Sequence, residues 1–197
     1  MRRSVILAVL ATLVLGACAQ PPIPEDHFYR LASRGPERAP SGTLPAGTIL
    51  VERFLADGIT AGRPIAYSDA ARANVLQTYH YHYWIEPPTI LLQTALAEYL
   101  RKAGAQQVVT PDLRVEPDVS IAGRIRGFEQ VRGATGFVRA HLELAVTERK
   151  SGRLMLFKSY TAEPRTSGDS VAEAAQQMSL AVDQIFAQFL RDLTHAR

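Results

Sequence analysis

Three stretches in the second half of the chain alternate between apolar and polar residues, which is the pattern of strands with one buried face. They cover residues 119–126, 137–147 and 154–162. Turn residues at 133–136 and 150–152 separate them, so the sequence predicts an antiparallel meander with one buried and one wet face. At Gly127 and Phe128 the alternation shifts phase, which predicts a β-bulge.

The first half of the chain carries shorter β-branched and aromatic runs between loops. These runs predict four strands, at 27–31, 48–55, 64–68 and 74–83. Residues 32–47 are rich in proline, glycine and polar side chains, which is typical of a surface loop. Residues 106–118 hold two prolines and predict a connection to the second half.

Two segments have apolar residues at steps of three and four, the spacing of an amphipathic helix. The first follows Pro87 and Pro88, because proline suits the first turn of a helix and prevents a helix before it. Gly104 predicts the C-terminal cap of this helix. The second helix begins at a capping box formed by Ser170 and Glu173 and runs for about seven turns.

The resulting element order, ββββ-α-βββ-α, lacks the strand–helix–strand alternation of a parallel α/β fold. Each helix has one apolar face, and two such helices can cover one face of a single sheet. We therefore predict one two-layer α+β domain over residues 27–197. Its sheet is expected to be largely antiparallel, with about six or seven strands and both helices on one face.

The N-terminus has the features of a signal peptide. Arg2 and Arg3 precede an apolar run at 5–15. That run has the length of a signal-peptide core and is too short to span a bilayer. The sequence therefore predicts a leader over residues 1–17.

The leader ends in Leu-Gly-Ala-Cys at 15–18, which resembles the bacterial lipobox. The resemblance implies cleavage before Cys18 and a diacylglycerol and an N-acyl chain on this residue, enough for stable membrane anchoring. Residues 18–26 predict a short proline-rich tether. Ala19 follows the cysteine, and by resemblance to enterobacterial sorting signals it implies the periplasmic face of the outer membrane. The alternative is an ordinary secretory signal with an incidental cysteine.

Charge and motifs exclude several classes of function. The formal net charge of +3 falls to +1 when Arg2 and Arg3 leave with the signal peptide, so nucleic acid is not an expected partner. Cys18 is the only cysteine, so no disulfide is expected. The sequence has no P-loop, dinucleotide-binding, serine-hydrolase or zinc-protease motif. We therefore predict no enzymatic activity, no catalytic residues and no cofactor other than the acyl chains on Cys18.

The strand at 74–83 carries histidines and tyrosines in alternation. His80 and His82 share one face and could contact one metal ion, but spacing identifies no third ligand, so we predict no metal site. Tyr79, Tyr81 and Tyr83 would lie on the opposite face. They serve either packing within the sheet or a partner surface.

Arginines and the only tryptophan complete the candidate partner-binding residues. Arg124, Arg126 and Arg139 fall on the wet face of the meander and could meet phosphate headgroups or an acidic partner; the alternative is a solvated face. Trp84 lies between strand and helix and is either a core residue or a docking residue, since tryptophan is enriched at interface hot spots. Tyr81 is the fifth member of this set.

Several of these features together resemble the ABC-type transport auxiliary lipoprotein family. They are the lipobox at Cys18, the strand Phe28-Tyr29-Arg30-Leu31, the patterns Ile49-Leu50-Val51-x-Arg53-Phe54 and Arg63-x-Ile65-x-Tyr67, and Tyr79-x4-Trp84-x-Glu86-Pro87-Pro88 before an aliphatic helix. The resemblance covers most of the mature chain, with the second half matching by pattern only. It implies an accessory to an ABC transporter with a periplasmic MCE-domain protein, docking at the outer membrane, often as a ring-like homo-oligomer.

Two further functions stay open. One is a lipid-carrying protein that shuttles a hydrophobic ligand in its own cavity. A cavity above a few hundred cubic ångströms between sheet and helices would favour the carrier. A filled core with an exposed apolar patch would favour docking. The other is a structural outer-membrane lipoprotein unrelated to transport.

Overall fold

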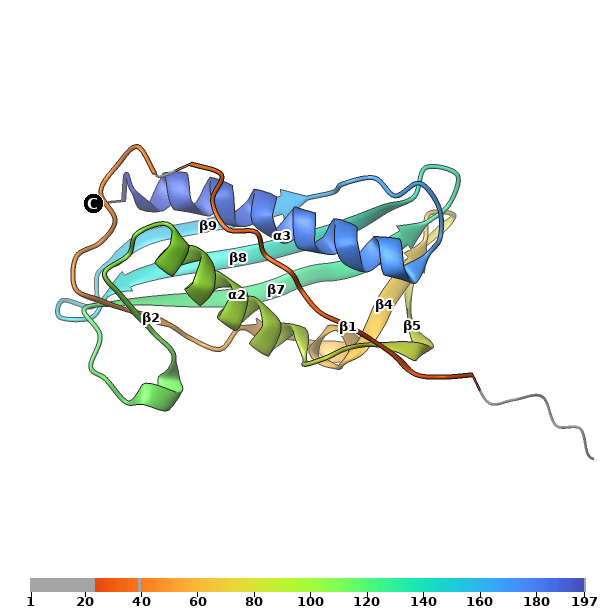
Figure 1. The fold of residues 1–197 in the computed structure, drawn as a ribbon, viewed down its shortest axis with the longest axis horizontal. Helices are drawn as coiled ribbons and strands as arrows, with labels where there is room; N and C mark the ends of the chain where they lie inside the picture. Colours follow the sequence, from red (N-terminus) through yellow and green to blue (C-terminus); the bar gives the residue numbers. More distant parts are fainter. Residues whose placement is uncertain (1–23, 39, 197) are drawn as a thin grey trace, which may run out of the picture.

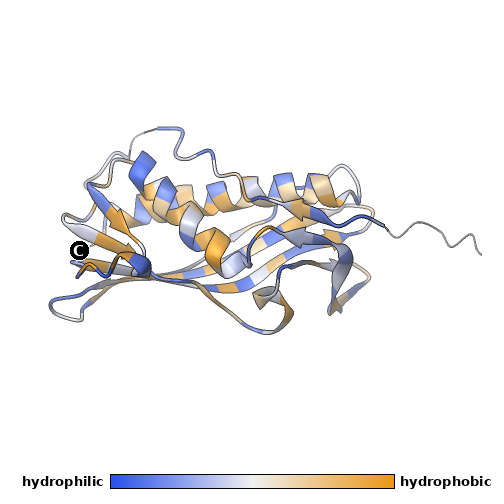
Figure 2. Ribbon diagram, turned by 60° about the horizontal axis from the view of Figure 1, so that its bottom comes forward, coloured by the Kyte–Doolittle hydropathy of each residue, from blue (hydrophilic) through white to orange (hydrophobic). Residues whose placement is uncertain are grey.

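The computed structural model describes residues 24–38 and 40–196 as a sheet with two long helices across one face (Figure 1). The strands of this part of the chain are β1 (His27–Tyr29), β2 (Thr48–Val51), β3 (Leu55–Ala56), β4 (Pro64–Asp69), β5 (Arg72–Trp84), β6 (Gln107–Val109), β7 (Val119–Arg132), β8 (Phe137–Glu148) and β9 (Leu154–Ala162). The helices are α2 (Pro88–Lys102) and α3 (Val171–Leu193), with 3-10 turns η1 (Gly58–Ala61) and η2 (Pro111–Leu113). Figure 2 shows both long helices on the same side of the sheet.

The sheet is built around β7. Along one edge β7 pairs antiparallel with β8, which pairs antiparallel with β9. Along its other edge β7 pairs in succession with β2, β3 and β4, all three parallel. β2 also pairs with β6 in parallel, whereas β4 forms an antiparallel hairpin with β5, whose far edge carries β1. The described residues therefore form one mixed sheet of nine strands.

The α+β class and the placement of both helices on one face confirm the prediction from the sequence. The number and direction of the strands differ from it. Nine strands replace the six or seven expected, and five of the pairings are parallel. The order ββββ-α-βββ-α gains two strands, because the strand predicted at 48–55 is split into β2 and β3 and the connection at 106–118 contains β6.

The split between β2 and β3 occurs where the chain turns toward the core. The carbonyl oxygen of Val51, the last residue of β2, accepts a hydrogen bond of 2.9 Å from the buried side chain of Gln93. Phe54 then lies in the core over Gly123 of β7, where an added Cβ would come within 2.5 Å of the phenyl ring. The apolar run itself continues through this turn, so its composition gives no sign of the break.

β6 pairs with β2 in a register that places Val108 opposite Ile49. The carbonyl oxygen of Val108 also accepts hydrogen bonds from the Arg101 guanidinium at 2.9 and 3.3 Å. This strand has only three residues and precedes a proline, which is why the sequence reads as a connection. The bulge predicted in β7 is confirmed by a register shift between Ile125 and Gly127 opposite β8.

The C-terminal end of α2 is a Schellman motif. Gly104 has φ +95, in the left-handed region that favours glycine. Its N–H donates to the carbonyl oxygen of Arg101 at 3.0 Å, and the N–H of Ala105 donates to that of Leu100 at 3.1 Å. The prediction that Gly104 ends this helix is confirmed.

Ser170 caps the N-terminus of α3, as predicted, but the Glu173 side chain bonds to another residue than the capping box requires. The Ser170 hydroxyl accepts a hydrogen bond of 3.4 Å from the N–H of Glu173. The Glu173 carboxylate accepts hydrogen bonds from the N–H and hydroxyl of Ser167 at 2.6 and 2.8 Å instead of closing a capping box. These bonds, with the backbone N–H contribution first, lower the pKa of Glu173.

Apolar side chains fill the space between the sheet and the helices. The largest that are fully buried are Trp84, Tyr99, Tyr160, Phe54, Phe186, Phe189, Ile49, Leu92, Leu96, Leu100, Ile121 and Leu142. They come from both helices, from inward-facing positions of the sheet and, in the case of Phe54, from the turn between β2 and β3. The core cluster extends along the chain from Ile49 to Leu193.

Candidate functional site

Trp84 lies in the core, although the sequence also placed it among the partner-binding candidates. Its side chain is 2% exposed, and its ring centroid lies 5.4 Å from that of Phe128. The backbone holds it as well: the Trp84 N–H donates to the carbonyl oxygen of Arg63 at 2.8 Å, and Arg63 Nε donates to that of Trp84 at 3.1 Å. The structure therefore assigns Trp84 the core position, and docking through this ring would require it to leave the core.

The outer edge of β5 is exposed over most of its length. β1 pairs only with the last residues of this strand, 82–84, and no strand of the described chain pairs with the same edge at 72–81. The apolar side chains of Val75, Leu76 and Tyr81 are 44%, 42% and 39% exposed. An exposed strand edge with apolar side chains is a place where a strand of another chain can pair. We call residues 72–81 the β5 edge.

The tyrosines of β5 do not share one face, contrary to the prediction from their alternation. The register with β4 shifts between Pro64 and Ala66, so the side chains of β5 lose their strict alternation there. Tyr79 donates a hydrogen bond of 2.9 Å to the buried side chain of Gln130, whereas Tyr81 is exposed. Tyr81 is thus the most exposed of the three tyrosines and the one best placed to contact a partner.

The histidines of β5 are part of an aromatic cluster. His82 Nδ1 lies 2.9 Å from the Tyr29 hydroxyl, and the ring of His82 stacks on His27 with centroids 5.1 Å apart. Burial, followed by the nearby His27, lowers the pKa of His82. Within residues 24–38 and 40–196, no three His, Cys, Asp or Glu side chains are grouped so that they could hold a metal ion.

The three predicted arginines are engaged in ion pairs on the wet face of the sheet. This face presents neighbouring charges of both signs, which weakens the case for an unbalanced basic patch. Hydrogen bonding to Glu163 is the main cause that raises the pKa of Arg139. The pairs are Arg124 with Asp57 at 2.9 Å, Arg126 with Glu143 at 2.9 Å, and Arg139 with Glu163 at 2.6 Å and Glu129 at 3.3 Å.

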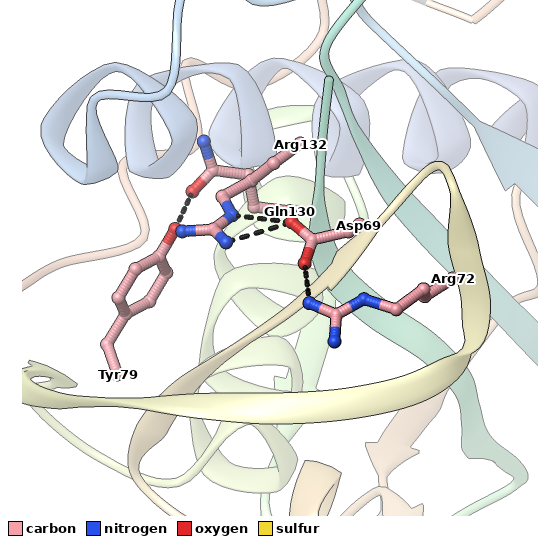
Figure 3. Close-up of polar contacts among 5 residues, drawn as sticks. All are labelled: Asp69, Arg72, Tyr79, Gln130 and Arg132. Carbon is pink, nitrogen blue, oxygen red and sulfur yellow. Dashed lines mark hydrogen bonds and ion pairs between the residues drawn. The ribbon is translucent and has the colours of Figure 1, made fainter.

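A second polar cluster joins the ends of β4, β5 and β7. Arg132 donates to Asp69 Oδ1 at 2.8 and 3.0 Å, and Arg72 donates to Asp69 Oδ2 at 2.8 Å (Figure 3). The hydrogen bonds from Arg132 first and then from Arg72 lower the pKa of Asp69. The Arg132 guanidinium also lies over the Tyr67 ring, 4.2 Å from its centroid. The cluster fastens the β4–β5 hairpin to β7.

A groove of about 740 Å³ lies between residues 34–38, 40 and 41 on one side and the outer surface of α3 on the other. The groove lies outside the layer between the sheet and the helices. A lipid carrier would need its cavity within that layer. The sequence shows this segment only as a surface loop and gives no sign of the groove. Its charged lining residues are Arg34, Glu37, Arg38, Asp183 and Arg191, and its less polar ones include Tyr99, Leu180, Ala187 and Leu190.

Residues 1–23 lie outside the described part of the chain. The signal peptide 1–17, Cys18 and most of the tether 18–26 therefore remain predictions from the sequence. Among the described helices, none combines the length and apolar character that crossing a membrane would require.

The sequence matches one protein family over most of its length. The match covers residues 29–189, and the family is described as the ABC-type transport auxiliary lipoprotein component. A search of curated proteins gave no match.

Solved structures share the fold at low sequence identity. A protein from Xanthomonas campestris superposes with a TM-score of 0.74 at 18% identity, covering 83% of this chain and 92% of its own. An uncharacterised protein gives a TM-score of 0.63 at 14% identity, covering 85% and 98%. A hypothetical protein from Chlamydia trachomatis gives 0.51 at 8% identity, covering 77% and 98%. At these identities the similarity supports the fold alone.

Proposed function

The chain belongs to the ABC-type transport auxiliary lipoprotein component family, and from this premise we propose that it docks a transport assembly at the outer membrane. The assembly is an ABC transporter with an MCE-domain periplasmic protein, which moves lipids between the two membranes. The chain is anchored to the periplasmic face of the outer membrane through acyl chains on Cys18. It acts by binding, not by catalysis.

The β5 edge is the observation that carries this proposal. It combines an unpaired strand edge, within the described chain, with the exposed side chains of Val75, Leu76 and Tyr81. Strand addition supplies main-chain hydrogen bonds, and exposed apolar side chains on the same strand supply affinity. This edge is therefore suited to pair with a segment of a partner.

The filled core supports docking over lipid carriage. Aromatic and aliphatic side chains occupy the layer between sheet and helices, including Trp84, Phe128 and Phe186. A carrier of acyl chains would need a cavity of at least several hundred cubic ångströms in an apolar setting. The groove beneath residues 34–38, 40 and 41 has that size, but charged side chains line much of it.

The position of the β5 edge also fits an anchored protein. β1 follows the first described residues and pairs directly with β5, so the chain enters the domain beside this edge (Figure 1). A short tether would hold this end of the domain near the membrane surface. A partner that reaches the outer membrane would then meet the β5 edge close to the anchor.

Co-purification with the MCE-domain protein from the same operon tests the proposal. The soluble chain 19–197 and the periplasmic part of the partner are mixed, and the complex is measured by size-exclusion chromatography with light scattering. We expect a complex at micromolar concentration or below. Two folded proteins that elute separately at all concentrations would rule out docking. The same measurement on the chain alone tests the ring-like homo-oligomer that the family resemblance implies.

A further inference from the structure

The segment 32–42 crosses the outer surface of α3, and we call its described residues the strap. Contacts with α3 and its C-cap hold the strap on both sides of the groove. On one side Asp183 accepts hydrogen bonds from the Ser33 hydroxyl at 2.6 Å and from the Arg34 N–H at 3.0 Å. On the other side Gly42 lies against Thr194, so closely that an added Cβ would come within 2.7 Å of its side chain. Between these contacts the groove of about 740 Å³ separates the strap from the helix.

Tyr99 of α2 is a largely buried residue that contributes to the lining of this groove. Its side chain is 2% exposed, and its ring packs edge-on against Phe186 with centroids 5.5 Å apart. It nevertheless lines the groove. Burial raises the pKa of Tyr99 to about 12, so its hydroxyl keeps its proton at neutral pH and can donate a hydrogen bond.

The charged side chains of the groove favour an anion. Arg34, Arg38 and Arg191 line it, and none of them has an acidic partner within 4.0 Å in the described structure. Two acidic residues oppose them, but Asp183 already accepts two hydrogen bonds from the strap. A guanidinium binds phosphate or carboxylate oxygens through paired N–H donors and stays charged at all relevant pH values.

We propose that the groove binds a phosphate-bearing amphiphile. The arginines and the Tyr99 hydroxyl contact the phosphate, whose several oxygens can accept bonds from more than one guanidinium. A small apolar portion lies against Leu180, Ala187 and Leu190 of α3. The volume is within the usual range of small-ligand sites. This site does not depend on the docking function, because it lies on another surface of the domain.

The groove also lies away from the anchored end. The first described residues project from one end of the domain, and the C-terminal end of α3 lies at the other (Figure 1). The groove is lined by residues from the second half of α3, including Asp183, Ala187 and Arg191. A phospholipid headgroup and a free phosphate present the same phosphate oxygens to the groove. Titration with each of them shows which one binds more tightly.

Isothermal titration calorimetry tests the site with the chain 19–197, which retains the core cluster from Ile49 to Leu193. The probes are dihexanoyl phosphatidic acid below its micelle concentration, inorganic phosphate, and octyl glucoside as an uncharged amphiphile. We expect phosphatidic acid to bind more tightly than inorganic phosphate and octyl glucoside not to bind. Tyr99→Phe and Arg191→Gln should each weaken the binding of phosphatidic acid about tenfold, the usual effect of removing a hydrogen bond to a charged group.

Arg149→Gln is the matched control, because it removes an exposed arginine outside the groove and should leave the affinity unchanged. Thermal melts of each variant show whether the fold is retained. Absence of phosphatidic acid binding to the folded chain overturns the proposal, as does equal affinity in Tyr99→Phe, Arg191→Gln and the parent chain. Inorganic phosphate binding as tightly as phosphatidic acid overturns the amphiphile and leaves a simple anion site. Loss of partner docking with retained phosphatidic acid binding would separate this site from the proposed function.

Discussion

The indole ring of Trp84 packs against the phenyl ring of Phe128, with centroids 5.4 Å apart and planes inclined by 48°. Phe128 belongs to the central strand β7, and Trp84 ends β5 immediately before the turn into α2. The contact therefore links the strand–helix junction to the middle of the sheet. It also explains why a residue that is a frequent interface hot spot is here inaccessible to a partner.

Trp84→Ala is expected to destabilise the domain by about 3–5 kcal/mol, the usual cost of deleting a large buried aromatic side chain. Chemical denaturation followed by circular dichroism measures the change. Tyr81→Ala, on the exposed part of the same strand, is the control and should change the free energy of unfolding by less than about 0.5 kcal/mol. Equal stability of Trp84→Ala and the parent chain would contradict the core assignment.

Gly123→Ala is expected to cost about 1–3 kcal/mol through overpacking, because the new Cβ would come within 2.5 Å of the Phe54 ring. Gly127→Ala on the same strand is the matched control, since its Cβ would meet its nearest neighbours at an ordinary 3.5 Å. The two variants are compared by urea denaturation. If Gly127→Ala is less stable than Gly123→Ala, the loss of stability does not come from contact with the Phe54 ring but from replacing a glycine in β7.

The Asp69 carboxylate should make the stability of the domain depend on acid pH. Its pKa lies below the ordinary value of 3.8, mainly because of Arg132 and then Arg72. A group with a lowered folded-state pKa stabilises the fold above its unfolded pKa, and this contribution is lost as the pH falls through the folded-state pKa.

Asp69→Asn should therefore lower the melting temperature at neutral pH, and its difference from the parent chain should shrink as the pH falls below 3.8. Thermal melts over this pH range measure the difference. Asp112→Asn, in the short turn η2, is the control for removing a carboxylate outside this cluster. A difference between Asp69→Asn and the parent chain that does not vary with pH would mean that the ion pairs are not its source.

Tyr81 is expected to contribute to partner binding at any salt concentration, since contacts of aromatic side chains carry affinity with little dependence on salt. Tyr81→Ala should weaken binding of the MCE-domain partner by about tenfold or more, measured by titration at two ionic strengths. Reversing the charge of Arg124, Arg126 and Arg139 should weaken it mainly at low salt, because rim charges act through the association rate. A loss of affinity from Tyr81→Ala that disappears at high salt would exclude this role.

Cys18 is predicted to be the membrane anchor. Cys18→Ser should leave an uncleaved precursor that migrates more slowly on a gel and incorporates no labelled palmitate. The parent chain in the same cells is the positive control. Palmitate incorporation in Cys18→Ser would show that the lipid is attached elsewhere.

The strands with long alternation could be placed from the sequence because each has one buried face. β8 and β9 lie within a residue of their predicted limits, and the capped ends of α2 and α3 follow from Gly104 and Ser170. The pairing of short strands could not be obtained in this way. β2, β3 and β4 pair in parallel with segments more than fifty residues away, and no local pattern records such partners.

The candidate surfaces likewise combine features that follow from the local sequence with features that depend on distant parts of the chain. Exposure of Tyr81 agrees with its predicted place on a surface, but the bulge in β5 that separates it from Tyr79 depends on tertiary contacts with β4. The groove was not predictable, because it requires residues 34–38, 40 and 41 to lie over α3, about 150 positions later in the chain. Nothing in the composition of either segment identifies the other.

The position of β7 between three groups of strands affects how the domain would form during the export that the leader at 1–17 predicts. Before residues 119–132 are available, the preceding chain can pair β1, β4 and β5 with one another, and β2 with β6, but no strand pairing connects these two groups. A chain that crosses the inner membrane N-terminus first thus presents separate, partly apolar pieces until its second half arrives. Because these contacts span long sequence separations, we expect folding to be slow and to be completed only after translocation, leaving a period in which periplasmic chaperones can bind.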